Sequence, residues 1–372
     1  MRLFHILKLV SQIILILSFS YKMDFKTTII SALDNMRIHE LRSSDSSSRF
    51  KVIAYNKAIA NLKGVTGSIR SVEDVKGVPG IGPKIMLKIE EIITTGGLAA
   101  AERVAAAPES KSMDALLKIH GVGAVKARGL LENGIRDIST LRAAIVRNPG
   151  ILNATQKIGL RYYEDGCLRI PRAEIVEHEK QLTVYVAGNS GSSGSSQILK
   201  WTIAGSYRRG AETSGDIDVL FSYDPRYDLD DALDEFKDTI KAMTRAGYIV
   251  DTLACGVKKW MGYVRLRPDL PARRLDMMVV IPEEYPFAIL YFTGSDKFNI
   301  AMRGYCHTIG YTLNEHRIAA TEPGRRAPPQ MMREEDIFEF LGLQYIPPTE
   351  RVDALQIIKK PAVAAVGGAG KA

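Results

Sequence analysis

The stretch IAGSYRRGAETSGDIDVLF, residues 203–221, places two aspartates two positions apart inside an apolar segment. Side chains two apart along a β-strand point to the same side, so Asp216 and Asp218 would project together. The apolar residues that follow each of them, Ile217 and Val219, would enter the core. Two neighbouring carboxylates repel each other, and a divalent cation removes that cost. Because hard oxygen ligands select Mg²⁺ or Mn²⁺, we predict a metal site at this strand.

A third aspartate, Asp276, lies in RRLDMMVVI, an apolar run typical of a buried strand. Three aspartates on neighbouring strands suit two cations about 3.5–4 Å apart, the arrangement for in-line phosphoryl displacement. The dipeptides Gly205-Ser206 and Ser214-Gly215 offer hydroxyl and backbone donors to phosphate oxygens. Arg209 adds a planar fork. An edge strand with solvent-facing aspartates is the simpler alternative, but the combined pattern favours nucleotidyl transfer.

Two segments, residues 78–93 and 119–135, share the form apolar-x-Gly-apolar-Gly followed by a basic helix start. This is the helix-hairpin-helix signature. We expect the four glycines to allow tight turns, since they have no Cβ: Gly80, Gly82, Gly121 and Gly123. Backbone N–H groups at the next helix would then face a phosphate and position DNA without reading its sequence. Ordinary helix corners are the alternative, but two copies with following basic residues favour DNA binding.

Lys84 and Lys88 are four residues apart and share one helix face, and Lys51 and Tyr55 have the same spacing on the preceding helix. A crowd of ammonium groups beside an apolar face can favour a neutral amine, which is a Schiff-base nucleophile. Plain phosphate-binding lysines are the other interpretation, and the residues alone favour it.

The composition narrows the class of protein. Lys and Arg number 50 against 42 for Asp and Glu, a net charge of +8 that suits a protein meeting polyanions. Three cysteines lie far apart and six histidines are scattered, which argues against a disulfide framework and a zinc finger. Any metal site must therefore rest on carboxylates.

The ends and one loop are predicted to stand apart from the folded domains. Residues 1–22 resemble a weak signal peptide but are interrupted by polar residues, so we expect a leader or extension rather than secretion, and no membrane partner. Residues 187–197 form a Ser/Gly-rich loop, predicted to be a solvated insertion. Residues 354–372 are Ala/Gly-rich and predicted to be a flexible tail.

From about Met23 to Arg351 the chain resembles the family X DNA polymerases. Its length is similar to that of beta-type members, and RRLDMMVVIPEEYPFAILYFTGSDKFNIAMRGYC and EEDIFEFLGLQYIPPTER look closer to lambda-type members. We expect an α+β fold: a helical N-terminal half with two helix-hairpin-helix motifs, a nucleotidyltransferase-type mixed β-sheet palm, and a small α+β nucleotide-selecting domain. The expected parts are residues 1–22 (leader or extension), 23–105 (helical, lyase-like, with the first hairpin), 106–170 (helical, DNA-binding, with the second), 171–282 (palm), 283–353 (nucleotide selection) and 354–372 (tail).

The resemblance also implies roles for single residues of the polymerase site. Asp216, Asp218 and Asp276 match the metal-binding carboxylates, and Asp276 fits the general base for the primer 3′-hydroxyl or its close partner. The triphosphate-binding set is matched by Arg169, Ser206, Arg209, Ser214 and Gly215. The nucleotide pocket is matched by Tyr291, Phe292, Gly294, Asp296, Asn299 and Arg303, of which Arg303 would face the template strand. Met278 replaces a beta-type arginine, and lambda-type members are also apolar there.

For the first hairpin, Lys88 matches the family's Schiff-base lysine, which removes a 5′-deoxyribose phosphate from an incised abasic site. Its supporting, phosphate-binding positions are matched by Lys51, Tyr55, Lys76 and Lys84. Phe50 stands where beta-type members have a histidine, which bears on lyase efficiency. Backbone carbonyls that bind a monovalent cation, Na⁺ or K⁺, are matched by Lys76, Val78 and Ile81 and by Leu117, Ile119 and Val122.

The expected reaction is template-directed addition of deoxynucleotides to a primer 3′-end with release of pyrophosphate, using two Mg²⁺ or Mn²⁺ ions, in gaps during base excision repair. The expected partners are gapped or nicked DNA and deoxynucleoside triphosphates, with the protein a monomer in the nucleus or another site of DNA repair. One alternative is a template-independent nucleotidyltransferase, against which the tandem hairpins and the short segment 263–275 argue. The other is a non-catalytic DNA-end-binding protein.

Overall fold

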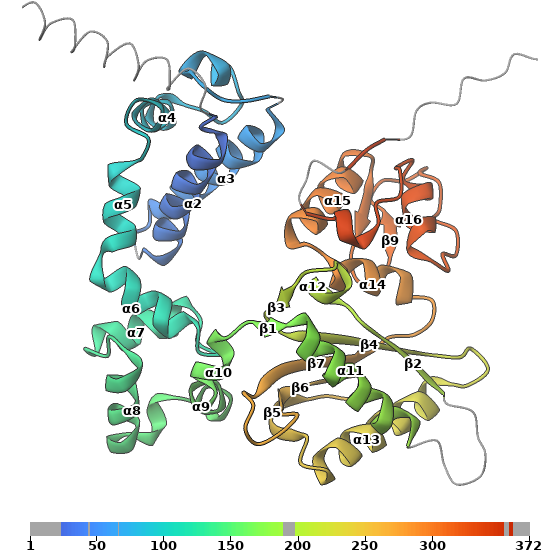
Figure 1. The fold of residues 1–372 in the computed structure, drawn as a ribbon. Coiled ribbons are helices and arrows are strands. Elements are labelled where there is room, and N and C mark those ends of the chain that lie inside the picture. Colours follow the sequence, from blue (N-terminus) through green and yellow to red (C-terminus); the bar gives the residue numbers. More distant parts are fainter. Residues whose placement is uncertain (1–23, 44, 66, 189–197, 353–356, 360–372) are drawn as a thin grey trace, which may run out of the picture. The chain divides into compact units, whose positions relative to one another are not determined.

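The computed structural model describes residues 24–352 and 357–359, apart from 44, 66 and 189–197. The chain divides into two compact units, Met1–Leu152 and Asn153–Ala372, and each is described by itself (Figure 1). The predicted leader, most of the Ser/Gly-rich loop and most of the tail lie outside the described residues. Among the described residues, no helix is both long and apolar enough to cross a lipid bilayer. The finer domain boundaries stay a prediction.

The first unit is helical throughout its described part. Its elements are α2 (Lys26–Arg42), α3 (Ser48–Gly64), η1 (Val72–Val75), α4 (Pro83–Thr95), α5 (Ala99–Ala106), α6 (Pro108–Leu117), α7 (Ala124–Glu132), α8 (Ile138–Arg147) and η2 (Pro149–Ile151). Helix α4 is amphipathic and buries Ile85, Ile89 and Ile92 in the core that α2 and α3 also form. A proline opens α4, and Gly96 in the left-handed conformation ends it.

Both predicted hairpins have the same backbone geometry. The first glycine of each is left-handed, with φ of 86° at Gly80 and 81° at Gly121. The second glycines are helix N-caps in extended conformation, with φ of −84° at Gly82 and −88° at Gly123. A Cβ at either second glycine would meet nothing within 4 Å. The expectation that all four glycines serve the tight turn was therefore wrong for the second of each pair, since any residue can adopt their backbone angles.

We predict that Gly80→Ala loosens the first hairpin. A Cβ at Gly80 would lie 2.8 Å from Lys57 Cγ and 3.3 Å from Ala58 N, at a φ that costs a non-glycine residue roughly 1–3 kcal/mol. Amide hydrogen exchange in α3 and α4 should accelerate in this variant. The matched control is Gly82→Ala, which should leave exchange in both helices near that of the parent. Equal exchange in the two variants would contradict the assignment.

The second unit contains a five-stranded mixed sheet. Its strands are β1 (Ile170–Pro171), β2 (Leu199–Ile203), β3 (Thr213–Ser214), β4 (Ile217–Tyr223), β5 (Ile249–Cys255), β6 (Lys259–Val264), β7 (Arg273–Val279), β8 (Tyr311–Leu313) and β9 (Ile318–Ala320). The order in the large sheet is β2-β4-β7-β6-β5, with only β4 and β7 parallel. Two-stranded sheets join β1 to β3 and β8 to β9. This confirms the expected α+β fold with a mixed-sheet palm.

The helices of the second unit cover the large sheet unequally. They are α9 (Ala154–Arg161), α10 (Tyr163–Cys167), α11 (Arg172–Ala187), α12 (Gly205–Arg208), α13 (Leu229–Arg245), α14 (Tyr285–Thr293), α15 (Asp296–Thr308) and α16 (Glu334–Phe340), with η3 (Pro348–Glu350) after them. Helices α11 and α13 lie along one face, where Leu275 and Met277 are buried against Phe236 (Figure 1). Successive strand residues alternate between faces, so Asp276, which lies between Leu275 and Met277, points to the opposite face of the sheet.

A buried ion pair fixes the start of β7. The guanidinium of Arg273, 5% exposed, donates to both carboxylate oxygens of Glu174 on α11, at 2.6 and 2.8 Å. Beside them, burial lowers the pKa of His178 to about 4, so its ring is neutral near pH 7. His178 Nδ1 lies 2.6 Å from the Tyr248 hydroxyl. Because the pair is charge-compensated and doubly hydrogen-bonded, it holds the strand that carries Asp276 against α11.

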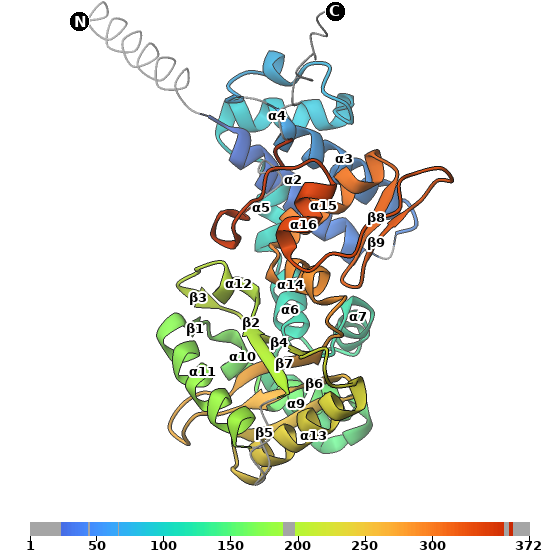
Figure 2. The ribbon, with the colours of Figure 1, turned by 90° about the vertical axis from the view of Figure 1, so that its right-hand side faces the viewer.

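The C-terminal part of this unit has its own small core. Phe298 and Met302 of α15 pack there with Ile337 and Phe338 of α16, beside the β8–β9 hairpin (Figure 2). A carboxylate at the start of α16, Glu334, links this part to the palm. It accepts from Arg351 at 2.7 Å and from Arg208 of α12 at 2.6 Å.

Candidate active site

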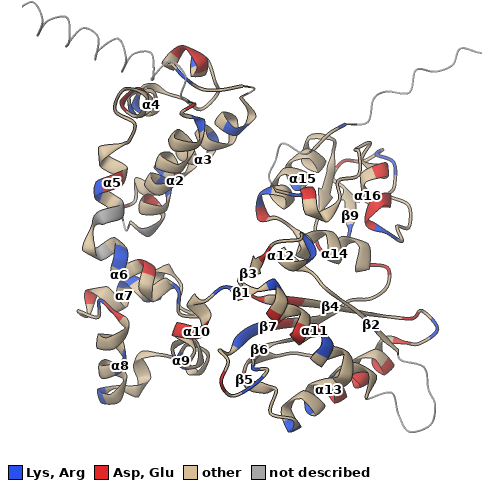
Figure 3. Ribbon diagram, in the orientation of Figure 1, with Lys and Arg blue, Asp and Glu red and all other residues tan. Residues whose placement is uncertain are grey.

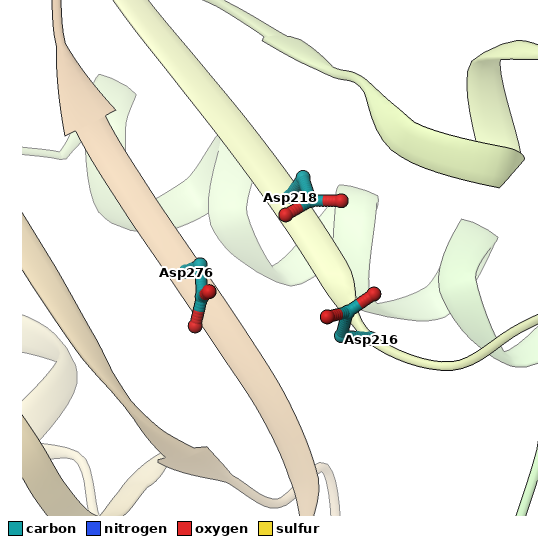
Figure 4. Close-up of side chains that lie close together, drawn as sticks. All are labelled: Asp216, Asp218 and Asp276. Carbon is teal, nitrogen blue, oxygen red and sulfur yellow. The ribbon is translucent and has the colours of Figure 1, made fainter. Parts of the chain in front are cut away.

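The three aspartates singled out from the sequence lie together on the open face of the sheet. Asp216 immediately precedes β4, and Asp218 of β4 is the register partner of Asp276 on the parallel strand β7. One carboxylate oxygen from each lies within 4.8 Å of the others (Figure 4). Ile217 and Val219 are each 1% exposed and enter the core, as the alternation predicted.

The electrostatics of this cluster suit a divalent cation. Burial, together with the neighbouring charge of Asp276, raises the pKa of Asp218 to about 6, although Lys259 and Arg209 act in the opposite direction. Asp276 Oδ1 is buried and has no hydrogen-bond partner among the described residues. A buried carboxylate oxygen without a donor is costly unless a cation or proton satisfies it. The three carboxylates therefore form a set of hard oxygen ligands for a divalent metal.

Arg274 is a site residue that the sequence analysis missed. Its guanidinium forms an ion pair with Asp216 and lies 3.9 Å from Asp276. Arg274 stands two residues before Asp276 on β7, so strand alternation places both on the same face. The two-residue spacing between Arg274 and Asp276 could have identified Arg274 from the sequence. Its ion pair with Asp216 could not be predicted in this way, because it depends on the pairing of β4 with β7, which are distant in the sequence.

Gly205 lies beside the aspartates at a point where its backbone comes close to the Asp218 carboxylate. Gly205, at the start of α12, has φ of 58°, and a Cβ there would lie 2.5 Å from Asp218 Oδ2. Only a glycine lets this backbone lie against the carboxylate without a shift.

The predicted phosphate-binding residues gather next to Gly205. Ser206 Oγ donates to Ser214 Oγ at 2.8 Å, and Ser214 is 1% exposed. The Arg169 guanidinium donates to the Thr213 carbonyl at 2.7 Å and to its hydroxyl at 3.2 Å. A Cβ on Gly215 would lie 3.3 Å from Arg169 Nη1, which places Arg169 directly at that glycine. Hydroxyl, backbone and guanidinium donors thus lie on the β3–α12 side of β4.

Arg209 links this predicted phosphate-binding side to the predicted nucleotide pocket. Its Nη1 donates to the Thr293 carbonyl at 2.5 Å, and a Cβ on Gly294 would lie 3.3 Å from it. Burial lowers the pKa of Arg209, while the charges of Asp296 and Asp218 act to raise it. Arg209 therefore sits between the aspartates and the start of α15.

The remaining pocket residues lie on α14 and α15. Asn299 Nδ2 donates to the Tyr291 carbonyl at 2.7 Å, and the Arg303 guanidinium lies 4.8 Å from the centroid of the Tyr291 ring. Phe292 meets Tyr291 edge to face but packs into the palm core around Leu220. Asp296 is the first residue of α15.

The lysines of the first hairpin lie in the first unit. Lys84 and Lys88 are on α4, with Lys84 exposed and Lys88 half-buried. Lys51 of α3 pairs instead with Glu40 at 3.2 Å and Asp45 at 3.7 Å, and the Glu40 hydrogen bond raises the pKa of Lys51. The sequence analysis did not foresee these carboxylate partners. Tyr55 is buried, and Phe50 is 74% exposed.

The six backbone positions predicted to bind a monovalent cation lie in the two hairpins. The N–H of Ile81 donates to the Val78 carbonyl at 3.2 Å, and that of Val122 to the Ile119 carbonyl at 3.0 Å. The other two positions, Lys76 and Leu117, come just before these turns. The two hairpins therefore share this backbone hydrogen bond at equivalent positions.

We predict that Mn²⁺ binding, followed by electron paramagnetic resonance, depends on Asp218 and on pH. Protonation of Asp218 competes with the cation, so affinity should fall as the pH drops through about 6. Asp218→Asn should abolish most binding at pH 7.5, because one of three charged ligands is lost. Asp238→Asn, an exposed α13 aspartate paired with Lys241, is the control and should bind like the parent. Unchanged Mn²⁺ affinity in Asp218→Asn would exclude this metal site.

Comparison with known proteins adds four family matches along the chain. They are the Helix-hairpin-helix domain over residues 26–98, the Fingers domain of DNA polymerase lambda over 114–166, the DNA polymerase beta palm over 169–283 and the DNA polymerase beta thumb over 288–352. The palm match includes all three aspartates, and the thumb match includes α15.

Three curated relatives align with most of the chain. DNA polymerase lambda of Rattus norvegicus is 30% identical over 318 residues, covering 82% of this chain and 52% of the relative. DNA polymerase lambda of Arabidopsis thaliana is 29% identical over 313 residues, covering 80% and 57%. The DNA polymerase type-X family protein pol4 of Schizosaccharomyces pombe is 28% identical over 313 residues, covering 80% and 59%. The chain spans between half and three fifths of the length of these relatives. With its aspartate cluster on a matching palm, this chain belongs to the family X DNA polymerases.

Proposed function

We propose that this chain adds deoxynucleotides to a primer 3′-end opposite a template strand and releases pyrophosphate. The observation that carries the proposal is the meeting of Asp216, Asp218 and Asp276 on one sheet face beside a cluster of phosphate donors. The palm, thumb and fingers matches support the same reaction.

Metal chemistry follows from the three carboxylates. A pair of Mg²⁺ or Mn²⁺ ions held by them would activate the attacking hydroxyl and neutralise charge on the triphosphate. Among the chain's own groups, Asp276 is the candidate to accept the proton of the primer 3′-hydroxyl, because its Oδ1 is buried and has no donor among the described residues. Arg274 balances the negative charge of Asp216 while the carboxylates are held close together.

The triphosphate would lie on the β3–α12 side of β4. Ser206 and Ser214 offer hydroxyl donors, and Arg169 and Arg209 offer charged donors to phosphate oxygens. The incoming sugar and base would lie along α14 and α15. There Tyr291, Phe292 and Gly294 would crowd the sugar and reject a 2′-hydroxyl, Asp296 and Asn299 would face the base, and Arg303 would face the template.

The substrate we propose is gapped or nicked DNA, bound by a monomer. The two hairpins would hold backbone phosphates through helix N–H groups, with Na⁺ or K⁺ bound by the turn carbonyls of each. Their matching geometry supports a shared role. We further propose that the protein acts in base excision repair in the nucleus, a setting suggested by its likeness to DNA polymerase lambda.

A 5′-deoxyribose-phosphate lyase activity is the second proposed function. It rests on Lys88, half-buried on α4 one helical turn from Lys84. The Lys88 amine would attack the sugar aldehyde to form a Schiff base with loss of water, and β-elimination would then release the 5′-phosphate strand. The alternative, a plain phosphate-binding lysine, makes no covalent bond.

We predict that Asp276→Ala extends a gapped primer roughly 10²- to 10³-fold more slowly than the parent with Mg²⁺ present, the range typical of losing a group that stabilises the transition state electrostatically. Single-turnover extension on a one-nucleotide gap measures this. Asp238→Ala on α13 is the control and should match the parent. Extension by Asp276→Ala at the parent's rate would refute the proposal.

The same assay separates the rival functions. Extension of a lone single strand as fast as a templated gap would indicate the template-independent enzyme. No metal-dependent incorporation of any nucleotide by the parent would indicate the non-catalytic DNA-end-binding protein.

We predict that borohydride traps the parent on incised abasic DNA and does not trap Lys88→Ala. Lys88→Arg keeps the positive charge but cannot form the imine, so it should bind this DNA and still escape trapping. Lys111→Ala on α6 is the matched control and should be trapped like the parent. Undiminished trapping of Lys88→Ala would remove Lys88 as the nucleophile.

A further inference from the structure

The order of strands separates two sides of the aspartate cluster. The phosphate donors lie on the β2 side of β4, on α12 and β3, while β6 flanks β7 on the other side. Asp218 and Asp276 lie between these sides because β4 and β7 are adjacent. The open face of the sheet thus runs from the phosphate donors, across the aspartates, to the Lys259 end of β6, whereas farther along β6 the Tyr263 ring is covered by Tyr162.

The geometry of phosphoryl transfer places the leaving group and the attacking hydroxyl on different sides of the aspartates. The attacking and leaving oxygens lie roughly in line on opposite sides of the phosphorus. If the triphosphate leaves toward α12, which rests on the proposed function, the primer 3′-hydroxyl must approach from the β7–β6 side. The terminal nucleotides of the primer would therefore lie over β6.

The register of β6 identifies which of its side chains face the primer. Met261 pairs with Asp276 and Lys259 pairs with Met278, without a register shift between these strands. Residues two apart share a face, so Lys259 and Met261 lie on the aspartate face. The residue between them, Trp260, is 1% exposed and lies in the core on the other face.

Lys259 is suited to bind an anion there. It is exposed, and no carboxylate of the described residues forms a salt bridge with it. Its charge acts on Asp218, which shows that it is within electrostatic reach of the cluster. Met261, in contrast, packs against the apolar cluster that includes Tyr263.

The charge on the opposite face makes that face less favourable for DNA than the aspartate face with Lys259. Helix α13 has aspartates along its exposed side, seen in red in Figure 3. They are Asp230, Asp231, Asp234 and Asp238. Two of them, Asp234 and Asp238, are paired with Lys237 and Lys241, so only part of this negative charge is left to oppose a DNA phosphate.

We propose that Lys259 binds a phosphodiester of the primer strand close to its 3′-end. The ammonium group acts as a point charge on a flexible stem, which suits a phosphate on a strand that moves forward after each addition. Lys259 is in this assignment a positioning residue. It holds the primer so that the 3′-hydroxyl reaches the aspartates, and it takes no part in the bond exchange.

The first experiment measures the affinity of the full chain for one-nucleotide-gapped DNA by fluorescence anisotropy at several salt concentrations. Lys259→Met should weaken binding roughly threefold to tenfold and lower the slope of log affinity against log salt by about one. Lys259→Arg should restore most of both. Lys237→Met on α13, where Lys237 pairs with Asp234, is the matched control and should change neither.

The second experiment locates the phosphate. Replacing single primer linkages near the 3′-end by neutral methylphosphonates should weaken binding by the parent at one linkage and have no further effect at that linkage in Lys259→Met, because the two changes remove the same contact. Fully additive effects at every linkage would overturn the proposal. Tryptophan fluorescence, from Trp260 in the core and Trp201 packed against it, would reveal a variant that fails to fold, and Lys259→Arg then provides the test.

The outcomes separate this inference from the proposed function. If the parent neither binds nor extends gapped DNA, the proposed function fails. If the parent does both and Lys259→Met keeps the parent's affinity and salt slope, only the role of Lys259 fails.

Discussion

Mutual repulsion of three carboxylates is the constraint on which the rest of the second unit depends. Asp216, Asp218 and Asp276 come within a few ångströms because β4 and β7 pair in parallel with Asp218 opposite Asp276. Unsupported strands would separate such charges. The sheet resists this through its buried face, and Arg274 supplies positive charge at the front.

Support for the site comes from both sides of the sheet and from the C-terminal part. Behind it, the Arg273–Glu174 pair holds β7 to α11. In front, Gly205 lets backbone approach Asp218 more closely than a side chain would permit, and Gly294, with φ of 65°, lies beside Arg209. Glu334, bound by Arg208 and Arg351, connects α12 to the core of α15 and α16. The residues proposed to select the nucleotide are therefore held relative to the aspartates by charge-assisted hydrogen bonds.

The two hairpins of the first unit depend on backbone geometry rather than on charged side chains. A left-handed glycine, a four-residue hydrogen-bonded turn and a glycine N-cap recur in both, although the side chains between them differ. Backbone N–H groups bind phosphate without regard to base sequence, which fits the proposed binding of DNA irrespective of its sequence.

The sequence by itself determined what depends on neighbours along the chain. Strand alternation places Asp216 and Asp218 on one face, and glycine spacing gives both hairpins, because these follow from local backbone geometry. Tertiary structure alone decided the pairing of Asp218 with Asp276, the contact of Arg274 with Asp216 and the capture of Lys51 by Glu40. Each joins segments separated by many residues, and whether a charge meets a carboxylate or a phosphate depends on which distant element packs beside it.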